Sequence, residues 1–522
     1  MTLPRLAHAA LAAALPAALA VVMPGGDRGR SSEGFSELKG ADGLVRVYDH
    51  ILDARFDQVD AEMGRACRVA PREACDVLAA TATWWRILLD PDSRALDPRF
   101  STEVEQAIHS TEAWAAREPQ NAEAHFYAGA AYAARVQWRV LRDEKLAAAR
   151  DGKRIKQALE RAIALDPDLD DAYFGIGLYQ YYADVAPAAA KVLRFLLLLP
   201  GGDKTEGLAR MNRARTQGKL VRGEADYQLQ ILYLWYERRA DLAIDLLESL
   251  HDRYPGNPLF AAQLADVEDR YQHDITASLA AWRALLADAR THRVHEPVLA
   301  EALARLGIAR QLEALSQTDH ALEQVRAVLD AHPAAPAGAM AAAYLALGEG
   351  EDRLGHHDAA VASYRLAIAA SPAPDPQAIR QRAADRMKRA PDPVRAEAYR
   401  LSLEGFRKFE KDDLAGAEPL LARSLALNPK DGVAHYRYGR VLQVKKEDAT
   451  AVAAFEAAIR SARDCPAPIV AAAYLEAARL DERLARQAQA IAYYRAASTL
   501  VGGGADTRAA ATRALVRLRA AR

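Results

Sequence analysis

The segment THRVHEP at residues 291–297 contains three residues of types that bind zinc. They are His292, His295 and Glu296. Their spacing differs from the helical zinc signatures, and Pro297 marks a loop or a helix start. A surface loop is therefore the favoured interpretation. No Ser/His/Asp order, HExxH motif or pair of carboxylates stands out elsewhere. The sequence predicts no catalytic residue, no metal site, no cofactor and a protein that is not an enzyme.

A glycine-rich turn at residues 200–207, PGGDKTEG, could bind a phosphate, because glycines before a helix N-terminus form an anion site. Lys204 lacks the spacing of a phosphate-binding loop. Helix capping explains the same residues, with Asp203 as the N-cap and Glu206 completing a capping box. We expect a helix start here.

Three cysteines occur in the chain. Cys67 and Cys75 flank a turn between two predicted helices, so an oxidising compartment would allow a disulfide between them. Two buried, reduced thiols are the alternative, and the residues leave both open. Cys465 has no counterpart, and the spacing does not fit a metal site.

Small and aromatic residues recur over residues 341–372 at the spacing of two short antiparallel helices. Gly348 and Ala360 would lie where the helices approach most closely, with Tyr344 and Tyr364 filling the space on either side. Pro372 cannot continue the second helix. Leu345, Glu349 and Asp352 would then point outward.

This segment resembles a tetratricopeptide (TPR) repeat. The matching positions are Tyr344, Leu347, Gly348, Ala360, Tyr364, Ala367 and Pro372. Related patterns occur before and after it, including an elongated unit over residues 121–167. The resemblance implies an all-α fold, a TPR-like right-handed α-solenoid of antiparallel helix pairs with an irregular N-terminal half and regular C-terminal repeats.

A narrower resemblance covers residues 175–260, which look like the core of the tetratricopeptide repeat protein 39 family and its bacterial relatives. The matching positions are Gly175 to Tyr179, Pro187, Gly202, Asp203, Gly207, Leu208, Tyr254 and Pro255. This resemblance implies a loose link with lipid handling and organelle surfaces.

The N-terminus resembles a secretory signal peptide, with Arg5, an apolar run over residues 9–22 and the small-x-small triplet at residues 18–20. An uncleaved anchor or a misassigned start is the alternative. The predicted divisions are a signal peptide at 1–23, a disordered tether at 24–40, a divergent TPR-like domain at 41–272, TPR repeats at 273–372, a bridging segment at 373–393, and C-terminal TPR repeats with a capping helix at 394–522. We expect a periplasmic or secreted protein.

Charge and hydropathy restrict the partners. The 69 basic and 70 acidic residues give a net charge of −1, which disfavours a protein that coats nucleic acid. Residues 192–199, VLRFLLLL, are too few to cross a bilayer and include Arg194. We therefore expect no nucleic-acid partner and no transmembrane span after removal of the leader.

Two sets of outward positions on first helices are candidate binding sites. The basic and aromatic C-terminal set, which could clamp an acidic peptide, comprises Arg400, Arg407, Lys408, Tyr436, Arg440 and Arg479. The aromatic middle set, which either holds an apolar ligand or is covered by neighbouring helices, comprises Phe126, Phe174, Leu178, Tyr181 and Tyr182.

The first hypothesis is thus a scaffold in the bacterial cell envelope that binds a protein or peptide through a concave groove. The alternative is a binding module for a lipid or other apolar ligand. On the first hypothesis, charge reversal at Arg407 and Arg440 should abolish binding while stability is kept.

Overall fold

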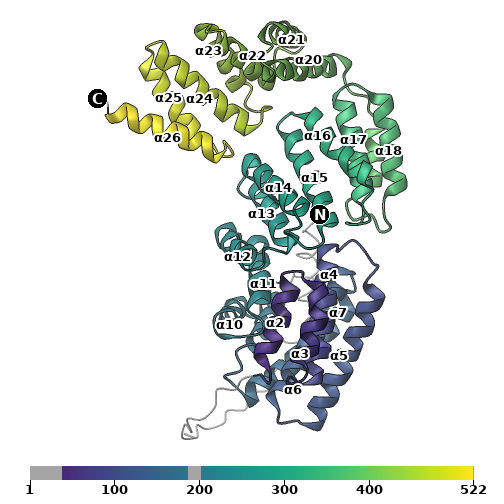
Figure 1. Cartoon of the computed structure of the whole chain (residues 1–522). Helices are drawn as coiled ribbons and strands as arrows, with labels where there is room; N and C mark the ends of the chain where they lie inside the picture. The colour runs from purple at the N-terminus through teal and green to yellow at the C-terminus, as the bar shows by residue number, and fades with distance from the viewer. Residues whose placement is uncertain (1–37, 186–200, 521–522) are drawn as a thin grey trace. The chain divides into compact units, whose positions relative to one another are not determined.

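The computed structural model describes residues 38–185 and 201–520, in which all regular elements are α-helices (Figure 1). The chain forms two compact units, Met1–Phe260 and Ala261–Arg522. The predicted signal peptide, most of the predicted tether, Pro187 and the apolar run at 192–199 lie outside the described residues. The end of that tether is packed, since Leu38 is buried and Gly40 precedes the first helix in a left-handed conformation.

The first unit consists of helices that pack mainly against their neighbours in sequence. They are α2 (Ala41–Leu52), α3 (Phe56–Ala66), α4 (Arg72–Leu89), α5 (Asp97–Arg117), α6 (Ala122–Leu141), α7 (Lys145–Leu165), α8 (Ala172–Val185), α10 (Lys204–Gln217), α11 (Arg222–Trp235) and α12 (Ala240–Arg253). Asn121 caps α6 by accepting hydrogen bonds from the backbone of Glu123 and Ala124. The α6–α7 hairpin, with helices of 20 and 21 residues, is the elongated unit that the sequence predicts.

Glycines bring α8 and α10 into backbone contact. A Cβ atom on Gly177 would lie 2.7 Å from the carbonyl oxygen of Gly207, and one on Gly207 would lie 2.7 Å from that of Gly177.

Asp203 caps α10 by accepting from the backbone N–H groups of Thr205 and Glu206, as the sequence predicts. The Glu206 carboxylate instead pairs with Arg210, so the reciprocal half of the capping box is absent.

The YPGN turn at residues 254–257 ties the end of the first unit to α2. The Tyr254 hydroxyl donates to Asp49 over 2.9 Å, and the Gly256 N–H donates to the Asp53 carboxylate over 2.7 Å. The Asn257 amide donates to the carbonyl oxygen of Leu52 over 2.7 Å. The turn is therefore a junction between segments some 200 residues apart in sequence.

The second unit is more regular. After α13 (Pro258–Arg270), which begins in the last residues of the first unit, come α14 (Ile275–Arg290), α15 (Pro297–Ala314), α16 (Thr318–Ala331), α17 (Ala339–Arg353), α18 (His357–Ala370), α19 (Ile379–Arg386), α20 (Pro393–Glu410), α21 (Leu414–Leu427), α22 (Gly432–Val444), α23 (Asp448–Arg460), α24 (Ala467–Arg483), α25 (Gln487–Thr499) and α26 (Ala505–Ala520). Residues 373–393, predicted to bridge two domains, contain α19, which packs on α17 and α18 inside this unit.

Close packing of a glycine against an aromatic ring holds the helix pairs together. A Cβ atom on Gly348 of α17 would lie 2.5 Å from the ring of Tyr364 on α18, and one on Gly439 of α22 would lie 2.8 Å from Phe455 on α23. Ala360 is fully buried, as expected. The prediction that Leu345 points outward is wrong. Leu345 is only 3% exposed and packs in the same core cluster as Tyr364. A first helix is covered on two sides, by its partner and by the next pair.

Candidate functional sites

A partly open cavity of about 130 Å³ lies in the first unit among α4, α6, α7, α8 and α11. Its wall is made by Trp84, Leu88, Ala133, Val136, Gln137, Val140, Ala148, Gly152, Ile155, Phe174, Gly175, Leu178, Tyr179, Tyr182, Ala183, Tyr227, Gln228 and Ile231. A smaller space of about 70 Å³ shares several of these residues, including Trp84, Gln137 and Phe174. Among the described residues of the two walls there is no lysine or arginine.

The predicted middle set divides between these spaces and the surrounding core. Phe174, Leu178 and Tyr182 line the larger cavity, and Phe126 joins Phe174 around the smaller one. Tyr181 lines neither, since its hydroxyl donates to Glu237 over 2.6 Å. Side chains of α4 and α11 form the opposite wall of the larger cavity, so Phe174, Leu178 and Tyr182 face other helices of the unit across it.

Two residues that line these spaces have a buried polar atom without a hydrogen-bond partner among the described residues. The Trp84 indole N–H and the Tyr127 hydroxyl are both buried, with side chains 2% and 1% exposed. Trp84 lines both spaces, and Tyr127 lines the smaller one. Neither atom has accessible surface, so neither faces the space that its residue lines, and each costs the protein the free energy of an unmade hydrogen bond.

A buried carboxyl group, Glu224 of α11, stands in the wall of the smaller space. It accepts hydrogen bonds from the Tyr48 hydroxyl at 3.0 Å, the Trp85 indole at 3.1 Å and the Gln228 amide at 3.2 Å. Burial raises the pKa of Glu224, and these hydrogen bonds oppose the rise. The Gln228 amide also donates to Gln137 over 2.9 Å, which extends the polar network to the larger cavity.

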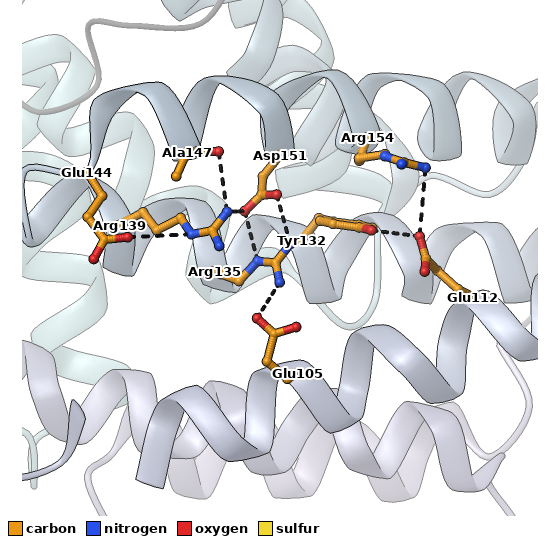
Figure 2. Close-up of polar contacts among 9 residues, drawn as sticks. All are labelled: Glu105, Glu112, Tyr132, Arg135, Arg139, Glu144, Ala147, Asp151 and Arg154. Carbon is orange, nitrogen blue, oxygen red and sulfur yellow. Dashed lines mark hydrogen bonds and ion pairs between the residues drawn. The ribbon is translucent and has the colours of Figure 1, made fainter. Parts of the chain in front are cut away.

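An ion-pair cluster joins α5, α6 and α7 (Figure 2). Asp151 of α7 is 4% exposed and accepts two hydrogen bonds of 2.8 Å from Arg135 and another from Arg139. Arg135 also pairs with Glu105 of α5. Because Gly152, next to Asp151, lines the cavity, the cluster fixes the helix that forms this wall.

The predicted C-terminal set lies on three first helices of the second unit, α20, α22 and α24. Most of its cations already have carboxylate partners: Arg400 pairs with Glu397, Arg407 with Asp319 and Glu410, Lys408 with Asp413, and Arg479 with Glu476. The set is therefore largely neutralised within the protein.

Arg407 is a brace between helices. Its guanidinium donates two hydrogen bonds to Asp319 of α16, and its side chain is 18% exposed. The expectation that its charge reversal would spare stability is wrong, because a glutamate at 407 would face Asp319 and Glu410 in a half-buried position.

Arg440 differs from the other cations of the set. It donates to the Tyr436 hydroxyl over 3.2 Å and lies 5.8 Å from the centre of the Phe409 ring, and no carboxylate among the described residues forms an ion pair with it. Tyr436 itself packs on the core cluster of α22 and α23. Arg440 thus keeps a charge that a partner could neutralise.

The structure joins Cys67 and Cys75 in a disulfide, between the end of α3 and the start of α4, and Cys465 is a buried free thiol.

Within residues 38–185 and 201–520, no cluster of His, Cys, Asp or Glu could hold a metal ion. In the same part of the chain, every helix is too short or too polar to cross a bilayer.

Short helices joined in pairs, with a small residue of one helix against a large residue of the next, define the architecture in both units. The fold is TPR-like. No family model matches the chain, and no curated protein matches it. Solved structures match it at low sequence identity.

The TPR2AB domain of yeast Sti1 in a pHSP90 complex is 15% identical, with 57% of this chain and 96% of that chain covered and a TM-score of 0.22. The human IFIT1 dimer with m7Gppp-AAAA is 13% identical, covering 81% and 94%, with a TM-score of 0.33. The APC/C hetero-tetramer Cut9–Hcn1 is 12% identical, covering 92% and 91%, with a TM-score of 0.25.

Sequence reasoning found the aromatic part of the cavity wall but missed Trp84, Gln137, Glu224 and Gln228. A pair of polar residues in α11 could have predicted this part of the wall. Glu224 and Gln228 lie four residues apart on a helix that is otherwise rich in apolar residues. Such a pair on a buried helix predicts an internal hydrogen-bond network.

Proposed function

We propose that the chain is a non-enzymatic scaffold that binds a protein or peptide through α20, α22 and α24 in its second unit. The observation that carries this proposal is a strip of side chains across these helices, Phe409, Arg440, Gln443 and Glu476. Arg440 of α22 reaches Phe409 of α20, and the Gln443 amide donates to Glu476 of α24 over 2.7 Å. A side-by-side row of first helices offers a partner one extended surface.

The charges of the strip suggest how a partner would be recognised. Because Arg400, Lys408 and Arg479 already pair with carboxylates, an acidic peptide would exchange these ion pairs rather than gain new ones. Arg440 is the cation that offers a new contact. We therefore propose that an acidic group of the partner docks at Arg440.

The test is capture of partners by the full chain from a periplasmic extract, compared among variants. Arg440→Glu should lose the partner, while Arg463→Glu, at an exposed loop arginine outside the strip, should keep it. Thermal unfolding of each variant controls for folding. A partner captured equally by both variants would overturn the strip as its binding site.

Location in the bacterial cell envelope, periplasmic or secreted, is part of this proposal. The residue pattern at 1–23 and the disulfide between Cys67 and Cys75 support an oxidising compartment outside the cytoplasm. Fractionation of the producing cells, with N-terminal analysis of the mature chain, tests it. A chain that stays in the cytoplasm with its leader intact would contradict export.

We propose as a second candidate function that the first unit binds an apolar ligand. The cavity of about 130 Å³, with Phe174, Leu178 and Tyr182 in its wall, is the observation that favours it. The resemblance of residues 175–260 to a family linked with lipid handling agrees with this candidate. Solvent extraction of the purified protein followed by mass spectrometry tests it, and extracts that match those of a cavity-filled variant would argue against it.

A further inference from the structure

Helices α24, α25 and α26 follow one another in the second unit (Figure 1), and an open hollow lies between them. Half of the described residues that line it are arginines, namely Arg479 and Arg483 of α24 and Arg513 and Arg517 of α26. We infer that this hollow binds a phosphate group through these four side chains. The inference goes beyond the proposed function and rests on neither of its two candidates.

The arginines form two pairs on facing helices. The members of each pair are four residues apart in sequence, so both side chains of a pair lie on one face of their helix. The Arg517 guanidinium reaches α24 and donates to the two carboxylate oxygens of Glu482 over 2.7 and 2.9 Å. The arginine faces of α24 and α26 are therefore opposite each other, with the hollow between them.

The paired arginines keep N–H groups that they do not use within the described protein. Arg479 donates to Glu476 through Nη1, and Arg517 donates through Nη2. Arg483 donates to Asp448 through Nε and Nη2. A guanidinium has five N–H donors, so each of the three can make further hydrogen bonds. Their side chains are 48%, 63% and 50% exposed, so a ligand can reach them.

Arg513 supplies the charge that the protein does not neutralise. Its guanidinium is exposed and forms no ion pair with a described residue. The other three arginines already meet three carboxylates, those of Glu476, Asp448 and Glu482. An anion in the hollow would therefore gain a new partner at Arg513 and add hydrogen bonds to the paired arginines.

A phosphate group suits this arrangement better than a carboxylate does. A carboxylate has two oxygens in one plane, whereas a phosphate group offers at least three strong acceptor oxygens that point in different directions. A phosphate group can therefore accept hydrogen bonds from guanidiniums of both helices at once. The planar guanidinium also forms two parallel hydrogen bonds to phosphate, which a lysine ammonium group does not.

The rest of the wall disfavours an acidic peptide. The other described lining residues are Glu482, Tyr494, Ala510 and Ala514. Tyr494 is 1% exposed, and its hydroxyl donates to Glu482. Peptide and protein partners depend on apolar anchor side chains that fill pockets, and two alanine methyl groups offer little apolar surface. The hollow therefore fits a small, charged group.

Calorimetric titration of the full chain with sodium phosphate and sodium acetate, at matched ionic strength, tests the inference. We expect phosphate to bind at least about 10-fold more tightly than acetate, the factor for one further charge-assisted hydrogen bond. Acetate binding as tightly as phosphate would overturn the inference, as would an absence of phosphate binding.

Variants at Arg513 locate the binding, because no ion pair of the described protein is broken by its substitution. Arg513→Gln should weaken phosphate binding at least about 10-fold, and Arg513→Lys, which keeps the charge without the planar fork, should restore part of it. Arg495→Gln, at an exposed arginine of α25 outside the hollow, removes the same charge and should keep the binding. Circular dichroism melting confirms that each variant folds. Equal losses in Arg513→Gln and Arg495→Gln, or no loss in either, would overturn the hollow as the site.

Two further probes identify the source of the group. Vesicles of phosphatidylcholine, with and without phosphatidate, test a lipid headgroup, and acetyl-hexaglutamate tests an acidic peptide. Sedimentation with phosphatidate vesicles that is lost in Arg513→Gln would assign the phosphate to a lipid, and binding of free phosphate without sedimentation would assign it to a soluble molecule. Hexaglutamate that binds more tightly than phosphate, with the same dependence on Arg513, would overturn the inference in favour of an acidic peptide.

Discussion

Glu123 is a carboxyl group in the first turn of α6 whose pKa burial raises to about 7 from the ordinary 4.5. It accepts a hydrogen bond of 3.0 Å from the backbone N–H of Lys39, which partly opposes the rise. Between these two pKa values the folded state holds a proton that the unfolded state has released. The stability contributed by Glu123 is thus present below pH 4.5 and is lost as the pH rises to about 7.

Glu123→Gln should remove this pH dependence and keep the acceptor for Lys39. We expect the variant to exceed the wild type in free energy of unfolding by about 1 kcal/mol at pH 8, after allowance for solvent screening, and to match it near pH 4.5. Urea unfolding at both pH values measures the difference, with the exposed Glu404→Gln as a control. The same difference at both pH values would contradict the assignment.

Two tyrosines of the second unit make the same hydrogen bond. The Tyr364 hydroxyl donates to Asp352 over 2.7 Å, and the Tyr494 hydroxyl donates to Glu482, each acceptor lying 12 residues earlier at the end of the preceding helix. The equivalent pairs in the two repeats between them are Phe409 with Leu421 and Gln443 with Phe455, so there the second residue is apolar.

Tyr364→Phe should therefore lower the free energy of unfolding by about 1 kcal/mol, the net worth of one hydrogen bond. Tyr474→Phe is the matched control, because the Tyr474 hydroxyl makes no hydrogen bond to the described residues, and it should change stability little. Urea denaturation followed by tyrosine fluorescence gives both values. Equal losses in the two variants would mean that the Tyr364 hydrogen bond contributes nothing specific.

At the scale of elements, the α8–α10 pair depends on backbone contact. Gly177→Ala would put a Cβ atom 2.7 Å from the carbonyl oxygen of Gly207 and 2.9 Å from Met211, so the helices must separate. We expect a loss of about 1–3 kcal/mol, the usual cost of overpacking. Thermal unfolding measures it.

Gly64 of α3, in contrast to Gly177, has room for a side chain. A Cβ atom there meets nothing within 4 Å, so Gly64→Ala should stabilise the helix by about 0.5–1 kcal/mol through the lower entropy of the unfolded chain. If both alanine variants were neutral, the close approach of α8 and α10 would not govern stability.

At the scale of the whole molecule, the chain has two compact units and one disulfide, which lies in the first. Breaking it in Cys67→Ser/Cys75→Ser should cost about 2–3 kcal/mol, the loop-entropy value for a separation of 8 residues. Calorimetry should show a lower transition temperature for the first unit alone.

Cys465→Ala in the second unit is the control for this experiment, since its buried thiol forms no disulfide. Its effect should be confined to the transition of the second unit. A disulfide variant that shifts both transitions equally would mean that the units unfold together.

The sequence by itself determined the repeat architecture, because the pairing of small and large residues in adjacent helices is local. The TPR-like fold, the capping by Asn121 and Asp203, and the buried Ala360 all follow from neighbours within about 40 residues. The signal peptide and the export that it implies stay predictions.

Only the tertiary structure decided which surfaces are free. Whether Leu345 is covered, Arg407 is neutralised by Asp319, or Phe174 faces a cavity that α4 and α11 also line depends on contacts between distant segments. Helical periodicity identifies the face of a helix on which a side chain lies, but it does not identify the distant helix that packs there. The candidate sites therefore changed with the structure, whereas the fold did not.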